Sequence, residues 1–322
     1  FEQAFDIDGQ AVYSGASIGI VLGRPDYQRP EQMLRDADTA MYRAKAAGKG
    51  KHVAFDEQMP AEARQRFDLQ SDMRGALERG EFRIHYQPVV SLRDGRWLGC
   101  EALLRWQHPK RGLLLPGEFL QIAEDTGFIA HLDAWVLAEA TRQVADWALQ
   151  PGLPPLTLNV NVDDRQLASS RLPIQLAEVL ARTGLPPESL RLEVTETIFR
   201  EDIDATNQRL QNLKMLGVGL VVDDFGTGYS SLDSFAASPF DAIKIDRGLV
   251  KDIDSNKRHL AIVRTIARFA QELGLELTVE GVERESQRQV LLASGCALAQ
   301  GFLFAKALAP DQFLAQWLAQ GR

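Results

Sequence analysis

Short apolar runs alternate with longer amphipathic stretches from about residue 68 to the end of the chain. The runs are residues 82–86, 98–105, 156–162, 190–196, 219–224, 242–246, 276–280 and 298–304. This alternation predicts strands that are each followed by a helix. Eight such strands in about 250 residues predict an α/β fold, a (β/α)8 barrel of the TIM type. A doubly wound open sheet is the rival fold, but no glycine-rich fingerprint follows the first strand.

The N-terminal part of the chain has a different pattern. It predicts a strand at residues 12–22, a helix at 31–47 and a second strand at 52–55. Apolar residues of the predicted helix fall on one stripe, namely Leu34, Ala37, Ala40, Met41 and Ala44. Three elements bury too little surface to be stable alone. We therefore expect this segment to be the end of a larger domain.

A helical connector is predicted between the two patterns. Residues 61–79 have high helix propensity, and Gly80 follows them as a stop signal. Phe1 lies in a pattern that is already under way. The sequence is therefore expected to be a piece of a longer protein.

Composition and charge narrow the function. Hydrophobic residues make up 45% and charged residues 25% of the 322 residues, as in ordinary globular proteins. A net charge of -8 argues against binding to a DNA or RNA polymer, although an acidic chain can still bind a nucleotide through metal ions. Cys100 and Cys296 form no CxxC pair, which favours a reducing, cytoplasmic location. The sequence contains no run of 18 apolar residues, so no membrane contact is predicted for this chain. The parent protein could still be anchored in a membrane.

Polar side chains lie at or near the end of almost every predicted barrel strand, where barrel enzymes carry their working residues. These residues are Glu101, Asn161, Glu193, Glu196, Asp223, Asp224, Lys244, Asp246, Glu280, Glu283 and Gln300. Each has an ordinary alternative when taken alone: Glu101 as a salt-bridge partner, Asn161 as a turn residue, and Asp223 with Asp224 as helix caps. A carboxylate within an apolar run costs free energy unless it is paired or binds a metal.

Five of these carboxylates would repel one another at one barrel mouth without cations: Glu101, Glu193, Asp223, Asp224 and Glu280. Oxygen ligands without histidine or cysteine select hard ions, Mg²⁺ or Mn²⁺ first and Ca²⁺ as an inert substitute. The adjacent Asp223 and Asp224 suit two ions placed close together, as used for in-line displacement at phosphorus. Lys244 adds a fixed cation that can orient water or a phosphoryl oxygen. Residues 225–232 predict a mobile loop, since Gly226 and Gly228 permit unusual backbone angles.

These residues resemble a known family. The segments YQP at 86–88, EALLRW at 101–106, NV at 161–162, EVTE at 193–196, DDFGTGYSSL at 223–232, KID at 244–246, EGVE at 280–283 and QG at 300–301 stand in its order. They resemble the EAL family of cyclic-di-GMP phosphodiesterases over about residues 68–309. The resemblance implies a barrel with one antiparallel strand and hydrolysis of cyclic-di-GMP to linear pGpG.

A second resemblance concerns the N-terminal segment. The residues SIG at 17–19, AD at 37–38, AMY at 40–42, AK at 44–45 and Gly48 resemble the C-terminal end of a GGDEF diguanylate cyclase domain. The signature loop of that domain would precede Phe1, so this chain is not expected to make cyclic-di-GMP. The implied organisation is a GGDEF remnant at residues 1–56, a helical connector at 57–79 and an EAL domain at 68–322.

The EAL resemblance also implies roles for individual residues. One metal would be bound by Glu101, Asn161, Glu193 and Asp223. Asp223 would bridge to a second metal held by Asp224 and Glu280, and Asp246 would support that metal or the attacking water. The metals would be two Mg²⁺ or Mn²⁺ ions, with Ca²⁺ inhibitory, and would activate water for in-line attack. The implied catalytic residues are Lys244, Glu280, Asp246 and Glu101, with Lys244 contacting the water.

Further implied roles concern the substrate. Gln87, Leu104 and Arg105 would hold it, Arg105 through a phosphate. Glu283 and Gln300 would line the pocket, and Glu196 would anchor the loop at 225–232. The sequence departs from the family at Asp163, where serine is usual, at Arg284 and at Phe302. The extra charge of Asp163 is expected to alter metal affinity.

Two other functions stay open. The chain could be a catalytically silent receptor for cyclic-di-GMP, although the motifs on which activity depends are complete. A glycosidase would also use a barrel with paired carboxylates, but Asn161 and Lys244 suit it poorly. The resemblance further implies a homodimer and control by upstream GGDEF or sensor domains of the parent chain.

Overall fold

The computed structural model describes residues 5–7, 10–12, 15–24, 27–46, 50–200, 203–226, 235 and 237–320. The chain divides into two compact units. One unit contains Phe1–Arg79 and Gln121–Thr126, and the other contains Gly80–Leu120 and Gly127–Arg322. Within the described residues, no helix has the length and apolar character needed to cross a membrane.

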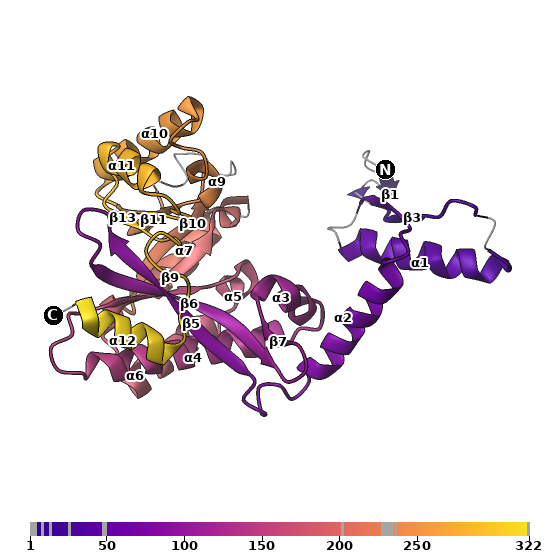
Figure 1. The fold of residues 1–322 in the computed structure, drawn as a ribbon, viewed down its shortest axis with the longest axis horizontal. Helices are drawn as coiled ribbons and strands as arrows, with labels where there is room; N and C mark the ends of the chain where they lie inside the picture. Colours follow the sequence, from indigo (N-terminus) through magenta and orange to yellow (C-terminus); the bar gives the residue numbers. More distant parts are fainter. Residues whose placement is uncertain are drawn as a thin grey trace. The chain divides into compact units, whose positions relative to one another are not determined.

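The first unit contains two small sheets and two helices (Figure 1). Its elements are β1 (Phe5–Ile7), β2 (Gln10–Val12), β3 (Ile18–Ile20), α1 (Pro30–Ala46), β4 (His52–Ala54) and α2 (Met59–Met73). β3 and β4 are parallel, and α1 is the crossover between them. The helix packs tightly on β3, because a Cβ atom at Gly19 would lie 2.0 Å from the carbonyl oxygen of Ala37.

Two predictions for this unit need correction. The strand predicted at residues 12–22 is β2 and β3, and residues 15–17 between them have no regular structure. The connector helix predicted at 61–79 begins earlier and ends at Met73. It ends there because Arg74 is extended and Gly75 adopts a left-handed backbone with φ of 74°, which helices use to terminate.

The second unit is a closed barrel of eight strands. Around the barrel the order is β5 (Phe82–Ser91), β6 (Trp97–His108), β8 (Thr157–Asn161), β9 (Leu190–Thr195), β10 (Gly219–Phe225), β11 (Ala242–Ile245), β12 (Glu276–Val279) and β13 (Leu298–Ala299). β13 pairs with β5 and closes the ring. β5 is antiparallel to both neighbours, whereas the other barrel pairs are parallel. The predicted barrel with one reversed strand is confirmed, and the open sheet is wrong.

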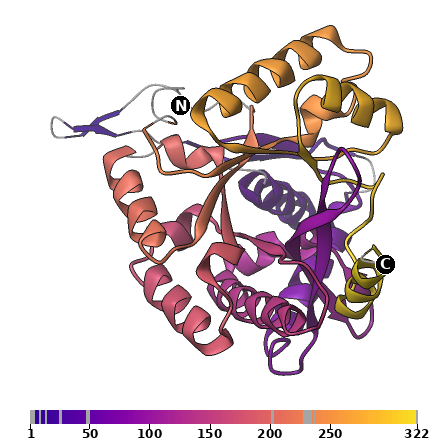
Figure 2. The ribbon, with the colours of Figure 1, turned by 90° about the vertical axis from the view of Figure 1, so that its left-hand side faces the viewer.

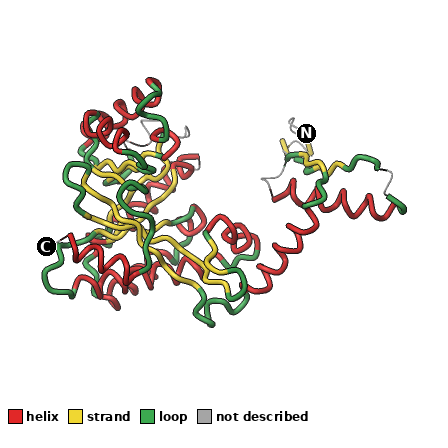
Figure 3. The backbone as a smooth tube through the Cα atoms, in the orientation of Figure 1, coloured by secondary structure: helices red, strands yellow, loops and turns green. Residues whose placement is uncertain are grey.

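Helices follow the parallel strands and lie outside the ring in Figure 2. They are α4 (Ile129–Ala148), α5 (Asp164–Ala168), α6 (Leu172–Thr183), α7 (Ile203–Lys214), α9 (Arg247–Val250), α10 (Lys257–Leu273), α11 (Glu285–Ala293) and α12 (Pro310–Gln320). The short elements η1 (Pro187–Ser189) and η2 (Glu196–Arg200) flank β9. Figure 3 shows the same alternation of helix and strand along the chain.

Local sequence explains where such a helix begins and ends. In α10 the side chain of Asn256 accepts hydrogen bonds from the backbone N–H groups of Arg258 and His259, at 3.0 and 3.3 Å. Gly274 ends the helix in a left-handed conformation. Val263 and Ile266 face the barrel because buried positions recur every three or four residues.

Burial of the strands on both faces explains why apolar runs predicted them. All four residues of β11 are buried, and β9 and β10 are almost as enclosed. The last run was predicted too long, since β13 ends at Ala299. Gly301 begins a turn there, in which the N–H of Leu303 donates to the carbonyl of Val282 at 3.0 Å. The sequence analysis predicted neither β7 (Gly112–Leu114), a three-residue strand on β6, nor α3 (Pro116–Asp125), and β1 was not predicted either.

Gly301 has no room for a side chain. A Cβ atom there would lie 2.1 Å from the carbonyl oxygen and 2.4 Å from the nitrogen of Val282. We expect Gly301→Ala to lower the free energy of unfolding of the barrel by about 2 kcal/mol. Urea unfolding followed by tryptophan fluorescence checks this, because all five tryptophans belong to the barrel unit.

Gly117→Ala is the matched control, since no heavy atom lies within 4 Å of a Cβ at Gly117. Its free energy of unfolding is expected to stay within about 0.5 kcal/mol of the wild type. Equal stability of the two variants would contradict the close packing at Gly301.

Candidate functional site

The site is built around the buried side chain of Lys244 on β11, which is 1% exposed. Its Nζ atom lies 2.5 Å from Glu280 Oε1, 2.8 Å from Glu193 Oε2 and 3.1 Å from Glu101 Oε2. Asp223 Oδ1 is 3.7 Å away. Four carboxylates, each on a different barrel strand or directly after it, therefore surround one ammonium group.

Carboxamide side chains complete this network. Asn161 donates to Glu101 Oε1 at 2.8 Å, and Gln300 donates to Glu101 Oε2 at 2.8 Å. Asn159 donates to Glu193 Oε1 at 2.7 Å. Asn159 was not predicted as a site residue, although it is a polar residue inside a predicted strand and shares a strand face with Asn161. Both buried glutamates are thus held by donors on more than one side.

The charges of the network shift several pKa values in the metal-free protein. Burial opposes charge on Lys244, but the surrounding carboxylates outweigh burial and raise its pKa well above the ordinary value. Burial raises the pKa of Glu193 well above its ordinary range, and the negative charge of Glu101 adds to this effect. Burial also raises the pKa of Glu280 to about 7. Glu101 differs, because Lys244 and the two carboxamides lower its pKa despite its burial.

Asp223 and Asp224 both reach the site because β10 is irregular at its end. The pairing of β10 with β11 shifts register between Val222 and Phe225, which indicates a bulge. In a regular strand, consecutive side chains point to opposite faces. Asp224 has a positive φ of 55°, and its N–H donates to Asp223 Oδ1 at 2.9 Å. The bulge thereby brings two adjacent carboxylates to one side.

The aspartate pair and Glu280 form a candidate cation site. One carboxylate oxygen from each of Asp223, Asp224 and Glu280 lies within 4.8 Å of the other two. Such an all-oxygen donor set fits Mg²⁺, Mn²⁺ or Ca²⁺. Burial and the charges of Asp223 and Asp246 raise the pKa of Asp224 to about 6. The carboxylate repulsion expected from the sequence is therefore present in the folded chain.

A cavity of about 270 Å³ opens beside this cluster. It is lined by Gln87, Glu101, Leu103, Asp223, Arg247, Glu280, Gly281, Glu283, Gln300, Gly301 and Phe302. Within the described residues, the buried Oε1 atom of Gln300 has no hydrogen-bond partner, so it can accept one from a ligand or water.

Some predicted substrate residues lie at this cavity and others do not. Gln87 accepts a hydrogen bond from Gln300 at 3.0 Å and shares the cavity wall with it. On β6 the cavity is lined by Glu101 and Leu103, and not by the predicted Leu104. The Nη1 atom of Arg105 donates to the carbonyl of Leu104 at 2.8 Å, and Arg105 is not among the lining residues. Contacts of Leu104 and Arg105 with a substrate stay predictions.

Two predicted residues connect the cluster to neighbouring segments. Glu196 Oε2 accepts a hydrogen bond from the N–H of Gly226 at 3.1 Å, at the start of the loop it was predicted to anchor. Residues 227–232 of that loop lie outside the described residues. Asp246 accepts from the N–H of Gly248 at 2.8 Å and caps α9. A hydrogen bond with Asp246 also helps to raise the pKa of Asp224.

Two of the departures from the family pattern, Asp163 and Arg284, have structural roles. Asp163 caps α5 and accepts a hydrogen bond from the N–H of Gln166 at 2.6 Å. Asp163 does not line the cavity, so its predicted effect on metal affinity has no direct contact behind it. Arg284 forms an ion pair with Asp254 at 3.0 Å and donates to the carbonyl of Lys251 at 2.8 Å.

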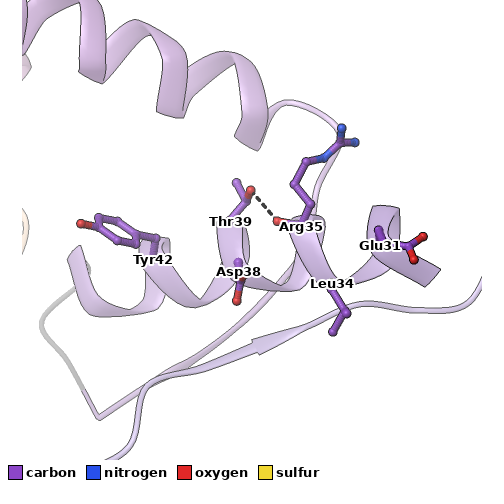
Figure 4. A pocket seen from close by; sticks show the side chains of 6 residues that line it. All are labelled: Glu31, Leu34, Arg35, Asp38, Thr39 and Tyr42. Carbon is purple, nitrogen blue, oxygen red and sulfur yellow. Dashed lines mark hydrogen bonds between the residues drawn. The ribbon is translucent and has the colours of Figure 1, made fainter. Parts of the chain in front are cut away.

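A second hollow, of about 540 Å³, lies along α1 in the first unit (Figure 4). Glu31, Leu34, Arg35, Asp38, Thr39 and Tyr42 line it, all from the same helix. The Thr39 hydroxyl donates to the carbonyl of Arg35 at 2.9 Å, which is a bond within the helix. This hollow brings together no second element and no cluster of chemically reactive groups.

The fold is a closed barrel with one reversed strand, and its site combines a buried lysine with an all-oxygen carboxylate cluster. These features define a class of barrel proteins suited to binding cations together with an anionic ligand. The protein-family model of the EAL domain matches residues 70–307 of the sequence. The chain therefore belongs to the EAL domain family. The model of the diguanylate cyclase GGDEF domain matches residues 1–51, as the second resemblance implied.

Similar proteins are named for activities on cyclic di-GMP. The bifunctional diguanylate cyclase/cyclic di-GMP phosphodiesterase MucR of Pseudomonas aeruginosa strain PAO1 is 41% identical over 97% of this chain and 46% of its own length. The cyclic di-GMP phosphodiesterase PdeR of Escherichia coli K12 is 38% identical over 92% of this chain and 44% of its own length. The chain thus spans about half the length of these relatives.

Solved structures agree with the fold. The PaMucR phosphodiesterase in its c-di-GMP complex has a TM-score of 0.73 and 41% identity, over 76% of this chain and 99% of that chain. The FimX EAL domain of Pseudomonas aeruginosa bound to c-di-GMP has a TM-score of 0.66 and 26% identity, over 73% and 94%. Both contain the barrel, and both bind a cyclic dinucleotide.

The raised pKa of Asp224 predicts a stability effect in the metal-free protein. Its pKa moves from the ordinary 3.8 to about 6, so folding retains a proton on it between these values. Stability from this group is fully present below about pH 4 and is lost as pH rises through about 6. Asp224→Asn removes the charge, and Asn tolerates the same left-handed backbone.

We expect metal-free Asp224→Asn to be more stable than the wild type by about 1 kcal/mol at pH 8, with little difference at pH 4. The figure is modest because water screens this half-buried carboxylate. Urea unfolding in excess chelator at both pH values measures the difference. A difference that does not grow with pH would show that repulsion does not act on Asp224.

Proposed function

We propose that this chain hydrolyses cyclic-di-GMP to linear pGpG in the presence of two divalent cations. The observation that carries the proposal is the set of three carboxylates, Asp223, Asp224 and Glu280, within 4.8 Å of one another beside the Lys244 network. The phosphodiesterase names of MucR and PdeR, and the c-di-GMP held by the PaMucR barrel, support the choice of substrate.

The proposed metal ligands are those implied by the sequence. Glu101, Asn161, Glu193 and Asp223 would hold one ion, with Asp224, Glu280 and Asp246 at the second. Their hard oxygen donors suit Mg²⁺ or Mn²⁺. When bound, such ions lower the pKa of water and offset negative charge on a phosphodiester.

The protein's own residues would position the reacting groups. Lys244 supplies a fixed positive charge that water and a phosphoryl oxygen can contact. Asn161 and Gln300 fix both oxygens of Glu101, which keeps this carboxylate in one orientation. The free Oε1 atom of Gln300 can accept a hydrogen bond from the substrate or from water.

The first test replaces Glu101. Glu101→Gln keeps the size of the side chain but removes its charge, and we expect kcat to fall by more than about 100-fold. Losing even a hydrogen-bond partner of a metal ligand costs about 10–100-fold. Appearance of pGpG, followed by chromatography, measures the rate.

Asp163→Ser is the matched control, since Asp163 is a carboxylate that caps α5 and does not line the cavity. Its rate and its Mg²⁺ dependence are expected to match the wild type. Unchanged hydrolysis in Glu101→Gln would contradict the proposed site. A Mg²⁺ requirement that changes in Asp163→Ser would instead restore the predicted influence of Asp163 on the metals.

Metal removal is the second test. Hydrolysis should stop in excess chelator, return with Mg²⁺ or Mn²⁺, and stay low with Ca²⁺, which binds oxygen ligands in a looser geometry. Binding of cyclic-di-GMP without hydrolysis in every ion would instead favour the silent receptor. Activity on an aryl glycoside with none on the phosphodiester would favour the glycosidase.

The arrangement of the chain stays part of the proposal. We assign residues 1–56 to a GGDEF remnant, 57–79 to a helical connector and 68–322 to the EAL domain, in a cytoplasmic protein whose upstream domains control the barrel. A homodimer is also proposed. Light scattering at working concentration tests it, and a monomeric mass with full activity would rule out a need for dimerisation.

A further inference from the structure

Part of a cyclic dinucleotide must lie outside the cavity beside the cluster. The cavity measures about 270 Å³, which is below the range of roughly 300–1,000 Å³ that encloses a drug-sized ligand. If the phosphodiester lies near the carboxylates, as the proposed function requires, at least one base must reach the rim. The question is which rim residues meet it.

Arg247 is an unengaged cation at this rim. It is exposed and follows Asp246 directly, and it is the one cation among the described residues that line the cavity. Its guanidinium forms no ion pair or hydrogen bond with a described residue, although Glu280 and Glu283 line the same cavity. The Cβ atom of Arg247 packs closely against Gly281, since a Cβ atom at Gly281 would lie only 2.4 Å from it. This packing holds the base of the Arg247 side chain in place.

Phe302 is an exposed aromatic ring on the same cavity. Its exposed fraction is 59%, and Lys306 Nζ lies 5.5 Å from the ring centroid. The backbone beside it is fixed, because the N–H groups of Phe304 and Ala305 both donate to the carbonyl of Gly301. The ring is therefore presented on a rigid turn.

An exposed aromatic ring and an unengaged guanidinium on one cavity are the two groups that recognise guanine. Aromatic rings stack on bases of any kind. An arginine guanidinium donates two hydrogen bonds to O6 and N7 of guanine, whereas adenine presents an amino donor in place of O6. Glu283, which the family resemblance already places at the substrate, can accept from the N–H groups on the other edge of guanine.

We propose that Phe302 and Arg247 form a guanine-recognition subsite at the rim, with Phe302 stacking on the base and Arg247 donating to O6 and N7. Arg247 would then be a specificity-determining residue that distinguishes cyclic-di-GMP from cyclic-di-AMP. This inference rests on the proposed function, because it assumes that the cavity receives a cyclic dinucleotide.

The test compares Arg247→Ala and Arg247→Lys with the wild type. Dissociation constants for cyclic-di-GMP and cyclic-di-AMP are measured by calorimetry in Ca²⁺, and kcat/KM in Mg²⁺. Both variants should bind cyclic-di-GMP about 10-fold more weakly and cyclic-di-AMP as before, because lysine keeps the charge but cannot make the paired bonds. Arg247→Ala keeps the Cβ atom that packs beside Gly281, so folding is preserved.

Phe302→Ala should weaken both nucleotides by about 10-fold, since stacking does not depend on the base, and Phe302→Tyr should restore most of the loss. Phe67→Ala and Arg264→Ala are matched controls, because both side chains are exposed and neither is among the residues that line the cavity. They should bind both nucleotides like the wild type.

Three outcomes would overturn the inference. Equal weakening of both nucleotides in Arg247→Ala, with rescue by Arg247→Lys, would assign Arg247 to a phosphate. Unchanged affinity in all Arg247 and Phe302 variants, while the wild type hydrolyses cyclic-di-GMP, would remove the subsite and leave the proposed function intact. A wild type that neither binds nor hydrolyses cyclic-di-GMP would remove both.

Discussion

The buried ammonium group of Lys244 is the charge on which the rest of the site depends. Glu101, Glu193 and Glu280 all lie within 3.1 Å of it, in a part of the barrel that water hardly reaches. Without this cation, carboxylates from different strands would face one another across a medium of low polarity, at a large cost in free energy. The barrel thus carries its own counter-charge, which acts against the burial that raises the pKa values of Glu193 and Glu280.

Strand geometry decides which carboxylates share this charge. Parallel strands in register place Asn161 beside Glu193 and Glu101 beside Asn159, so the glutamates and their amide donors meet without any loop between them. The aspartate pair needs something more, because neighbours in a regular strand diverge. The bulge at the end of β10 and the left-handed backbone of Asp224 bring both aspartates to the same side. Rigid strands therefore position the glutamates, and one local irregularity positions the aspartates.

The sequence predicts the barrel well because its strands are buried on both faces, which leaves continuous apolar runs such as residues 242–246. It predicts the main polar residues for the same reason, since a carboxylate in such a run stands out. A three-residue strand such as β7 leaves no comparable pattern, and neither do the ends of α2 at Met73 and of β13 at Ala299. Asn159 and Arg247 were not predicted as site residues. Their roles depend on neighbours from other strands and loops, which the spacing of residues along the sequence does not show.

The packing of Gly281 against Arg247 makes the two positions differ in the substitutions that they tolerate. A Cβ atom at Gly281 would clash with the Cβ of Arg247, so every residue type other than glycine is excluded there unless the loop moves. Beyond its Cβ, however, the side chain of Arg247 extends into the open cavity and is restrained by no described partner. One wall position is therefore closed to change while its neighbour is free to vary. A substitution at Arg247 therefore changes the chemistry of the cavity wall and leaves intact the strands that hold its carboxylates.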